Sequence, residues 1–534
     1  EEIGIARIEK GILQGDSLSP QLFVIAMEPL SRILNRNCDK VQIYDTNFKR
    51  NHLIFIDDIK LLAKDEQDLQ ELCFYTKSCL KQMGFQVNEQ KSASNIDSEQ
   101  AFGEEIDNEK GYKYLGVLED SRNVFKEENK KLIEEKIIER TEKLCQTKLN
   151  AKNLMHAINE YAISTINYYV GLLNYEMYEF DGIDQKIRNI LQKHGVIRNA
   201  SNIDRLYLAR DELGRGLCNI SEKAEIMMMN LHDQMEKSTE YCPVIEVEKN
   251  MTQMGLIKEV LKRKYQIGDE DLEAKTIKAK QKEIRMNRIM EKNMHRILFE
   301  NEDGHIDTKQ SSLWLRKGNI SLQEEGSICK LQDRNVFFNR MRCPHCKKGT
   351  MSVEHLATNC GGMLSFDYKK RHDDVVRCIH LMFAKKYGLS KSKKLKNYKV
   401  ENVISNERVR IKSDVAVITD NRIPNNKPDL MIHDLKTNDI LLVEVGITSK
   451  RILPNTETTK RRKYELLANE LKSMYGSKVM VVPIVITWDG LVTRHHRKHA
   501  ESLGISDKIQ AYIQGQVLKR TLESVRIDVT NPQD

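Results

Sequence analysis

The chain has 534 residues, enough for about three or four domains, and its 40% hydrophobic and 31% charged residues exclude collagen-like and wholly disordered proteins. No run of about 18 apolar residues is present, which excludes a membrane span. The net charge of +8 is compatible with nucleic acid as a partner, and the 11 scattered cysteines favour a reducing compartment and a metal site over a disulfide framework.

A polar loop precedes the first predicted helix. Residues 11–20 read GILQGDSLSP, and a helical apolar pattern begins at Leu22. Ser19 suits the N-cap and Pro20 the first helical position, so the loop is predicted to lie at a helix N-terminus, where backbone N–H groups favour anions. Taken alone, the pattern is more often that of a plain loop before a helix.

The next signal is a pair of aspartates between two apolar runs. Residues 52–63 read HLIFIDDIKLLA, which predicts a β-hairpin with Asp57 and Asp58 at its tip. Two carboxylates on a rigid turn suit magnesium in phosphoryl transfer, although adjacent aspartates are also common in purely structural turns. Asp65 is predicted to cap the following helix, and Gly84 to end it.

The motifs of residues 1–120 follow one another in a familiar order. After the loop and the Asp-Asp hairpin come a Gly-x-x-x-Asn-x-x-Lys stretch from Gly84 to Lys91 and the sequence YLG at 114–116. In this order and spacing they resemble the palm of reverse transcriptases of non-LTR retrotransposons. The resemblance implies that Asp57 is the main magnesium ligand and that Asp58 supports it.

The same resemblance assigns the residues around the nucleotide. It implies contacts with the incoming nucleotide and template by Gln14, Gly15 and Asp16, and with the phosphates by Lys91, although a lone lysine after a turn is more often only solvated. Family members often have Pro at the position of Ser17 and Ala at that of Ile56. The palm also needs a third metal-binding Asp from a strand before the loop, so the chain is expected to lack its front and the fingers, and not to polymerise DNA unaided.

Residues 123–230 have mainly helical periodicity. Within them, residues 205–217 read RLYLARDELGRGL and resemble the thumb signature of the same elements. Gly214 and Gly216 predict a tight turn that exposes Arg215 to a nucleic-acid backbone. Farther on, residues 274–296 hold eight Lys and Arg against two Glu, which fits either a solvated linker helix or a surface that contacts phosphates.

A cysteine and histidine cluster follows. Cys343, Cys346, His355 and Cys360 have the spacing C-x2-C-x8-H-x4-C. Two thiolates on a tight turn, with a His and a Cys about one helical turn apart, make a four-ligand set for structural zinc; isolated buried thiols are the alternative. The resemblance extends here, because site-specific retrotransposons with a single reading frame carry such a knuckle between thumb and nuclease.

The last constellation lies in residues 427–447. Two apolar runs around a polar turn predict a hairpin that brings Asp429 and Glu444 together. A buried strand rarely accepts an unpaired Glu, so Glu444 requires a partner, either a metal or a structural ion pair. Lys460 and Lys463 open the next helical pattern, and two carboxylates with a lysine are the components of metal-assisted phosphodiester hydrolysis.

This region resembles the restriction-like endonuclease of site-specific non-LTR elements. Arg371 and His372 match that family's RH-x-x-V segment, which implies a contact with nucleic acid. Gly446 stands where the usual D/E-x-K triad has its lysine. The cation is therefore expected from Lys460 or Lys463, with Lys463 preferred.

Together these features predict an α+β multidomain protein. The expected domains are a partial right-hand polymerase palm (1–120), a helical thumb (121–244), a basic helical linker (245–340), a CCHC zinc knuckle (341–362) and an α/β restriction-like nuclease (363–534). The resemblance implies an RNA-directed DNA polymerase with a DNA endonuclease that acts by target-primed reverse transcription. Its expected cofactors are magnesium and structural zinc, and its partners are element RNA, target DNA and deoxynucleotides, in the nucleus after synthesis in the cytoplasm.

Two rival interpretations remain at this point. The first is a catalytically inactive or domesticated remnant that only binds RNA or DNA. The second is a host polymerase with a related palm, such as a telomerase-like or intron-like enzyme, against which the restriction-like tail counts.

Overall fold

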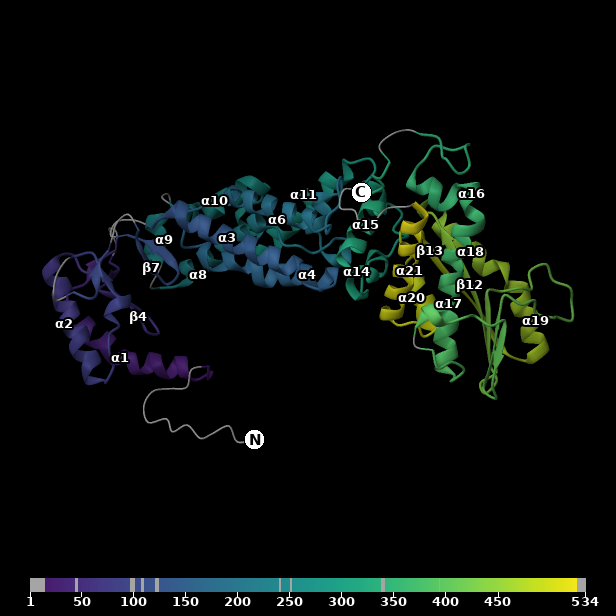
Figure 1. The fold of residues 1–534 in the computed structure, drawn as a ribbon, viewed down its shortest axis with the longest axis horizontal. Coiled ribbons are helices and arrows are strands. Elements are labelled where there is room, and N and C mark those ends of the chain that lie inside the picture. Colours follow the sequence, from purple (N-terminus) through teal and green to yellow (C-terminus); the bar gives the residue numbers. More distant parts are fainter. Residues whose placement is uncertain are drawn as a thin grey trace. The chain divides into compact units, whose positions relative to one another are not determined.

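The structure is a computed structural model, and it describes residues 15–43, 47–96, 101–106, 110–120, 124–239, 242–249, 252–337, 341–392 and 394–525 (Figure 1). It divides into two compact units, one formed by residues 1–136, 165–180 and 221–277 and the other by residues 137–164, 181–220 and 278–534. Helices and several small sheets alternate, which confirms the mixed α and β content predicted from the sequence. Among the described residues, no helix has the length and apolar character needed to cross a membrane.

The first unit begins with two helices packed around short hairpins. Its elements are α1 (Ser19–Asn37), β1 (Val41–Gln42), β2 (Lys49–Arg50), β3 (His52–Phe55), β4 (Asp58–Leu61), α2 (Glu66–Gln82), β5 (Ala93–Ser94), β6 (Glu104–Glu105), β7 (Tyr112–Tyr114) and β8 (Val117–Glu119). Leu30 and Leu34 of α1 pack against Leu72 and Leu80 of α2. This core supports the β3–β4 hairpin from one side, because Ile54 and Ile59 pack on it.

The ends of α1 and α2 test the predicted caps. Asp65 caps α2 as expected, since its carboxylate accepts a hydrogen bond from the N–H of Asp68 at 2.9 Å, and Gly84 follows the helix with a φ of 81°. The predicted N-cap Ser19 is wrong by one residue: Leu18 holds that position. The reason is that the carboxylate of Asp16 accepts the N–H of Leu18 at 2.7 Å, which starts the helical turn earlier.

The rest of the first unit is helical. It contains α5 (Ile166–Tyr169), α8 (Ile220–Lys237), α9 (Cys242–Glu248) and α10 (Gln253–Tyr265), while α3 (Lys126–Cys145) and α11 (Ala274–Met290) continue into the second unit. The helical part of the second unit contains α4 (Ala151–Ala157), α6 (Asp181–Lys193), α7 (Ile203–Tyr207), α12 (Arg296–Phe299), α13 (Thr308–Ser311), α14 (Leu313–Lys317) and α15 (Leu322–Gln332). Lys282 of the basic helix α11 pairs with Glu212, and Arg288 lies 3.0 Å from Asp204, so part of its charge is neutralised within the protein.

A five-stranded sheet organises the C-terminal part of the second unit. It runs in the order β13 (Lys478–Thr487), β12 (Asp439–Thr448), β11 (Leu430–Asp434), β10 (Val409–Ser413) and β9 (Val403–Ser405). β12 and β13 are parallel and the other pairs are antiparallel. The surrounding helices are α16 (Gly361–Met363), α17 (Lys369–Lys386), α18 (Leu453–Lys463), α19 (Glu465–Tyr475), α20 (His496–Ser502) and α21 (Asp507–Val525).

The two faces of this sheet are covered by different helices. Val443 and Val445 of β12 pack in the core with α17 and α21, whereas Ile440 and Leu442 pack with α19. Side chains alternate along a strand, so Glu444 shares the face of Ile440 and Leu442. That face is the one on which α18 and α19 lie.

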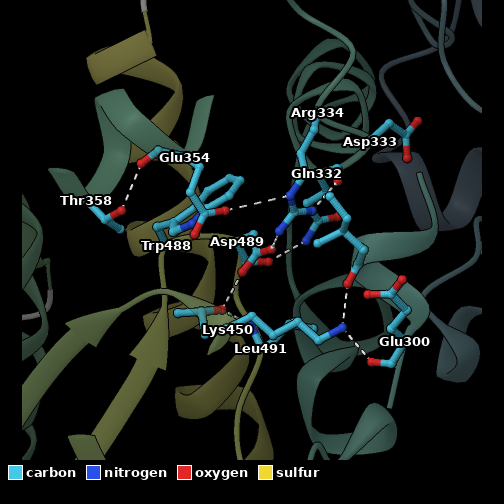
Figure 2. A network of polar contacts seen from close by, with 12 residues as sticks. Glu300, Gln332, Asp333, Arg334, Glu354, Thr358, Lys450, Trp488, Asp489 and Leu491 are labelled. Atoms are coloured by element: carbon cyan, nitrogen blue, oxygen red, sulfur yellow. Dashed lines mark hydrogen bonds and ion pairs between the residues drawn. The ribbon is translucent and has the colours of Figure 1, made fainter. Parts of the chain in front are cut away.

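A polar network joins the sheet to the helical part of the same unit (Figure 2). Arg334, which follows α15, forms an ion pair with Asp489 at 2.6 Å, and its guanidinium lies 4.9 Å from the ring centre of Trp488. Gln332 donates to the backbone carbonyl of Asp489 at 2.6 Å, and Lys450 donates to the backbone carbonyl of Glu300. These contacts hold segments that are more than 100 residues apart in one compact body.

Candidate functional site

The Asp-Asp turn is the first candidate site. β3 and β4 form the predicted hairpin, in which Phe55 pairs with Asp58, and Ile56 and Asp57 make the turn. Ile56 has a φ of 56°, an unusual value for a β-branched residue. Backbone strain of this kind collects at functional sites. Both aspartates are exposed, so their carboxylates are free to meet a cation.

The YLG turn lies beside this hairpin. Lys60 of β4 forms an ion pair with Glu119 of β8 at 2.5 Å, and its ammonium lies 5.0 Å from the ring centre of Tyr114. Burial, with the nearby charge of Asp58, raises the pKa of Tyr114. The hydroxyl of Tyr168 donates to the carbonyl of Leu115 at 2.6 Å and so supports the turn from behind.

The other residues assigned to the nucleotide lie in loops. Gly15 has a φ of 95°, which glycine adopts readily, and Asp16 is exposed next to it. Lys91 is exposed, and its carbonyl accepts a hydrogen bond from Tyr112 of β7 at 2.6 Å. Gln14 lies outside the described residues.

The second candidate site lies between β11 and β12. These strands form the predicted hairpin: Leu430 pairs with Val443, which puts Asp429 opposite Glu444. The carboxylate of Asp429 accepts the N–H of Val445 at 2.7 Å, and the same oxygen lies 3.1 Å from Nε2 of His372. The register therefore places the two carboxylates side by side on the interior strands β11 and β12, with the imidazole of His372 on Asp429.

Glu444 is the most buried of these groups, with 1% of its surface exposed. Its Oε1 accepts hydrogen bonds from Lys460 at 2.7 Å and from Lys463 at 3.0 Å. Both lysines lie in the last turn of α18, so the prediction that they open a helix is wrong. Its Oε2 has no hydrogen-bond partner among the described residues. The ion pair weighed at the sequence level is present, and one buried acceptor remains unsatisfied, which costs free energy unless a cation or water binds it.

The charges of the site follow from these contacts. Burial lowers the pKa of His372, but the hydrogen bond and the charge of Asp429 outweigh it, so the pKa of His372 is raised. Burial raises the pKa of Asp429, but the hydrogen bonds from His372 and Val445 outweigh it, so the pKa of Asp429 is lowered. At neutral pH Asp429 is a carboxylate, as a metal ligand must be.

The cysteine and histidine cluster is the third candidate site. Ligand atoms of Cys343, Cys346, His355 and Cys360 lie within 4.8 Å of one another. The Sγ atoms of Cys343 and Cys360 are 3.6 Å apart, and Sγ of Cys346 is 3.3 Å from Nε2 of His355. The four residues predicted as zinc ligands are thus brought together by the fold.

Local structure explains the spacing of this cluster. His355 opens a π-helical turn over His355–Asn359, and the N–H of Cys360 donates to the carbonyl of His355 at 2.7 Å. A π-turn brings residues i and i+5 to one side, which the H-x4-C spacing requires. Gly349 leaves room for the imidazole, because a Cβ there would lie 2.5 Å from the His355 ring.

The chemistry of the donor set fits zinc. Backbone N–H groups of Gly349 and Lys348 lower the pKa of the Cys346 thiol to about 6. A thiolate is the form that binds metal, and three cysteines with one histidine make a closed tetrahedral set.

Two cations predicted to contact nucleic acid are buried instead. Arg215 is only 4% exposed, and its Nε donates to Glu325 at 3.0 Å. Arg210 binds the same carboxylate with both terminal nitrogens, at 2.9 and 3.0 Å. The expectation that Arg215 is exposed is therefore wrong, because the turn around it packs on α15. Gly214 belongs to this packing, since a Cβ there would lie 2.1 Å from the carbonyl oxygen of Leu208.

Arg371 is the second of these cations. It is 1% exposed, donates to Oγ of Ser524 at 3.0 Å and to the carbonyl of Ala357, and burial lowers its pKa to about 10. The predicted contact with nucleic acid does not fit this position. Its neighbour His372, predicted in the same role, lies in the carboxylate site, a placement that the sequence could not show because His372 and Asp429 are 57 residues apart.

Comparison with known families bears on the first candidate site. Two exposed carboxylates on a rigid turn suit the divalent metal that phosphoryl transfer uses. Residues 2–118 match the family model for reverse transcriptase (RNA-dependent DNA polymerase). The match supports a retroelement reverse transcriptase, an RNA-directed DNA polymerase that acts on a nucleic-acid template and nucleotides, usually with a divalent metal. No curated protein matches the chain.

Proposed function

We propose that this chain belongs to the reverse transcriptase and endonuclease of a site-specific non-LTR retrotransposon. In this proposal, residues 363–534 nick the target DNA, and the freed 3′-hydroxyl primes reverse transcription of the element's RNA in the nucleus. The single observation that carries the nuclease part is the meeting of Asp429, Glu444 and two lysines on one face of the sheet, with Oε2 of Glu444 buried and unsatisfied.

The donor set of this site fits magnesium. Asp429 and Glu444 offer the hard oxygen ligands that magnesium prefers, and one buried oxygen of Glu444 meets no other partner in the part of the chain that the structure describes. When bound, the ion would activate a water molecule and offset the charge on the phosphate. In the reaction, water oxygen bonds to phosphorus as the bond to the 3′-oxygen breaks, which leaves a 3′-hydroxyl and a 5′-phosphate.

The residues around the carboxylates have separate tasks. His372 and the N–H of Val445 hold the carboxylate of Asp429 in position. Lys460 and Lys463 carry positive charge to the place where negative charge grows on the phosphate. Lys460 is the closer of the two to Glu444, so we assign it the larger share of this task, in place of Lys463.

The two other sites complete the proposal. Asp57 and Asp58 would hold the magnesium of the polymerase site. Zinc in the Cys3His cluster would be structural, because Cys343 and Cys360 are buried in a core that includes Trp314 of α14 and Leu518 of α21.

Plasmid nicking tests the nuclease. The purified chain is expected to convert supercoiled plasmid to open circles in magnesium but not in EDTA. Asp429→Asn and Glu444→Gln should each lower the rate at least about 100-fold, since each removes a charged ligand. Asp414→Asn, an exposed aspartate on the loop before β11, is the matched control and should nick normally.

One observation favours the rival interpretation. The two lysines on Glu444 already neutralise it, as they would in a remnant that only binds nucleic acid. Salt-dependent DNA binding without magnesium-dependent nicking, or equal nicking by wild type and Asp429→Asn, would support the remnant and refute the nuclease.

A further inference from the structure

A cavity in the helical part of the second unit is lined by arginines. It measures about 210 Å³ and lies between α6, the segment of residues 194–202, the start of α7 and α15. Arg188, Arg198, Arg205 and Arg215 line it, and Asp333 is the carboxylate among its lining residues. None of these groups belongs to the proposed nuclease or polymerase site.

Hydrogen-bond donors without a partner converge on this cavity. They are Nε of Arg188, Oγ of Ser201, Nδ2 of Asn202 and Nη2 of Arg215, none of which meets an acceptor among the described residues. Asn202 and Arg215 are 5% and 4% exposed, so these donors lie deep in the cavity, whose lining also includes exposed residues such as Gln185 and Asn199. Because buried donors without acceptors destabilise a fold, four of them in one cavity indicate a ligand that supplies acceptor atoms.

The charge of the cavity gives the sign of that ligand. Glu325 is shared between Arg210 and Arg215, so one carboxylate balances two guanidiniums. Asp333 is paired with Arg205 at 3.1 Å. Arg188 hydrogen-bonds to the neutral hydroxyl of Tyr207 at 2.7 Å. Even without Arg198, the guanidiniums of Arg188, Arg205, Arg210 and Arg215 outnumber the two carboxylates that pair with this group, Glu325 and Asp333, which favours an anion.

We propose that this cavity binds a phosphate group. A phosphate offers several acceptor oxygens to converging donors, and guanidinium groups match its geometry. The volume equals about seven water molecules at roughly 30 Å³ each, enough for a phosphate but below the roughly 300 Å³ of pockets for whole organic ligands. The group can be inorganic phosphate, the 5′-phosphate of a strand or a backbone diester, and this inference does not depend on the proposed nuclease.

Arg188 is the best residue to change, because it is half-buried at the cavity and its hydrogen bonds go to two neutral groups, the hydroxyl of Tyr207 and the amide of Gln185. Arg188→Gln removes the charge and the fork of donors. Arg422→Gln removes the same charge from an exposed residue outside the cavity and is the matched control. Ser201→Asp puts a carboxylate into the cavity and blocks an anion by repulsion.

Calorimetry measures the binding of inorganic phosphate to the full chain. Fluorescence anisotropy with labelled oligonucleotides that carry a 5′-phosphate or a 5′-hydroxyl then distinguishes a terminal phosphate from a backbone diester. Arg188→Gln and Ser201→Asp should each weaken phosphate binding by about tenfold or more, and Arg422→Gln should leave it unchanged. Tryptophan fluorescence verifies that each variant is folded.

Tighter binding of the 5′-phosphorylated strand would identify a terminal phosphate, and equal binding of both strands, weakened alike by Arg188→Gln, would identify the backbone. Either result supports the proposal. It is overturned if wild type binds none of the probes, or if the folded Arg188→Gln and Ser201→Asp variants bind them as wild type does. Nicking activity is measured in parallel, so a failed nuclease and a failed phosphate site are distinguishable.

Discussion

Glu325 allows a direct test of whether Arg210 and Arg215 are structural. Its carboxylate is 2% exposed and accepts three hydrogen bonds, two from Arg210 at 2.9 and 3.0 Å and one from Arg215 at 3.0 Å. Glu325→Gln keeps the size of the side chain but removes its charge. It also turns one acceptor oxygen into an NH2 donor that faces a guanidinium.

The size of the effect follows from this geometry. Removal of one partner from a buried ion pair costs about 3–5 kcal/mol, because the remaining charge stays buried. Here two guanidiniums lose the same counter-charge, but the glutamine carbonyl still accepts a hydrogen bond. We therefore expect the free energy of unfolding of the second unit to fall by about 4 kcal/mol, a large part of the roughly 5–15 kcal/mol of a typical domain.

Urea unfolding followed by tryptophan fluorescence measures this loss. The chain has two tryptophans, Trp314 and Trp488, both buried in the second unit. Glu324→Gln is the matched control: this half-buried side chain pairs with Lys519 and accepts hydrogen bonds from Ser321 at the start of α15, which a glutamine can still accept, so the change should cost about 1 kcal/mol or less. Equal stability of Glu325→Gln and Glu324→Gln would refute the structural role of the arginines.

The pH dependence gives a second readout of the same carboxylate. Burial raises the pKa of Glu325, but the charges of Arg210 and Arg215 outweigh it, so its pKa in the folded state is lowered. A carboxyl whose pKa is lower in the folded state than in the unfolded state stabilises the fold at any pH above its unfolded-state pKa, which is about 4.3 for glutamate. This stabilisation is lost as the pH falls from that value toward the folded-state pKa. Wild type should lose stability more steeply than Glu325→Gln below about pH 4.3, and identical slopes would contradict the assignment.

Two further predictions concern packing and zinc. Gly214→Ala should lower the free energy of unfolding of the second unit by about 1–3 kcal/mol, because the new Cβ would lie 2.1 Å from the carbonyl oxygen of Leu208. Its control is Gly182→Ala in α6, where no described atom lies within 4 Å of the new Cβ. In the same urea assay this control should be neutral or stabilising by about 0.5 kcal/mol. Cys343→Ser should lower the zinc content, measured by elemental analysis, from about one equivalent to none, while Cys218→Ser should keep it; zinc retained by Cys343→Ser would remove the cluster as its site.

Local features of the fold were predictable from the sequence. The cap at Asp65, the hairpin at Asp57 and the hairpin between Asp429 and Glu444 depend on neighbours within about 20 residues, and the structure has all three. The Cys3His cluster was predictable because its four ligands are encoded by spacing alone. In each case the interaction that decides the geometry lies within the motif.

The roles of the buried cations were not predictable in this way. Arg215 is 110 residues from Glu325, and Arg371 is 153 residues from Ser524. An arginine between two glycines, such as Arg215, predicts an exposed turn when the neighbouring sequence offers no acidic partner. The carboxylate of Glu325 reaches Arg215 only because α15 packs on this turn. A cation in a motif therefore indicates a required interaction, but the sequence does not show whether its partner is nucleic acid or the protein itself.

The position of Gly446 links the fold to the candidate chemistry. Gly446 is two residues after Glu444 and therefore lies on the same face of β12. A Cβ at this position would lie 3.3 Å from Val485 of β13 and 3.5 Å from Thr456 of α18. A long side chain at this position would push α18 away from the sheet. With glycine there, α18 packs close, and Lys460, one turn after Thr456, reaches Glu444 at 2.7 Å. Gly446 therefore explains two features together: the strand has no lysine at this position, and α18 packs close enough for Lys460 to supply the positive charge instead.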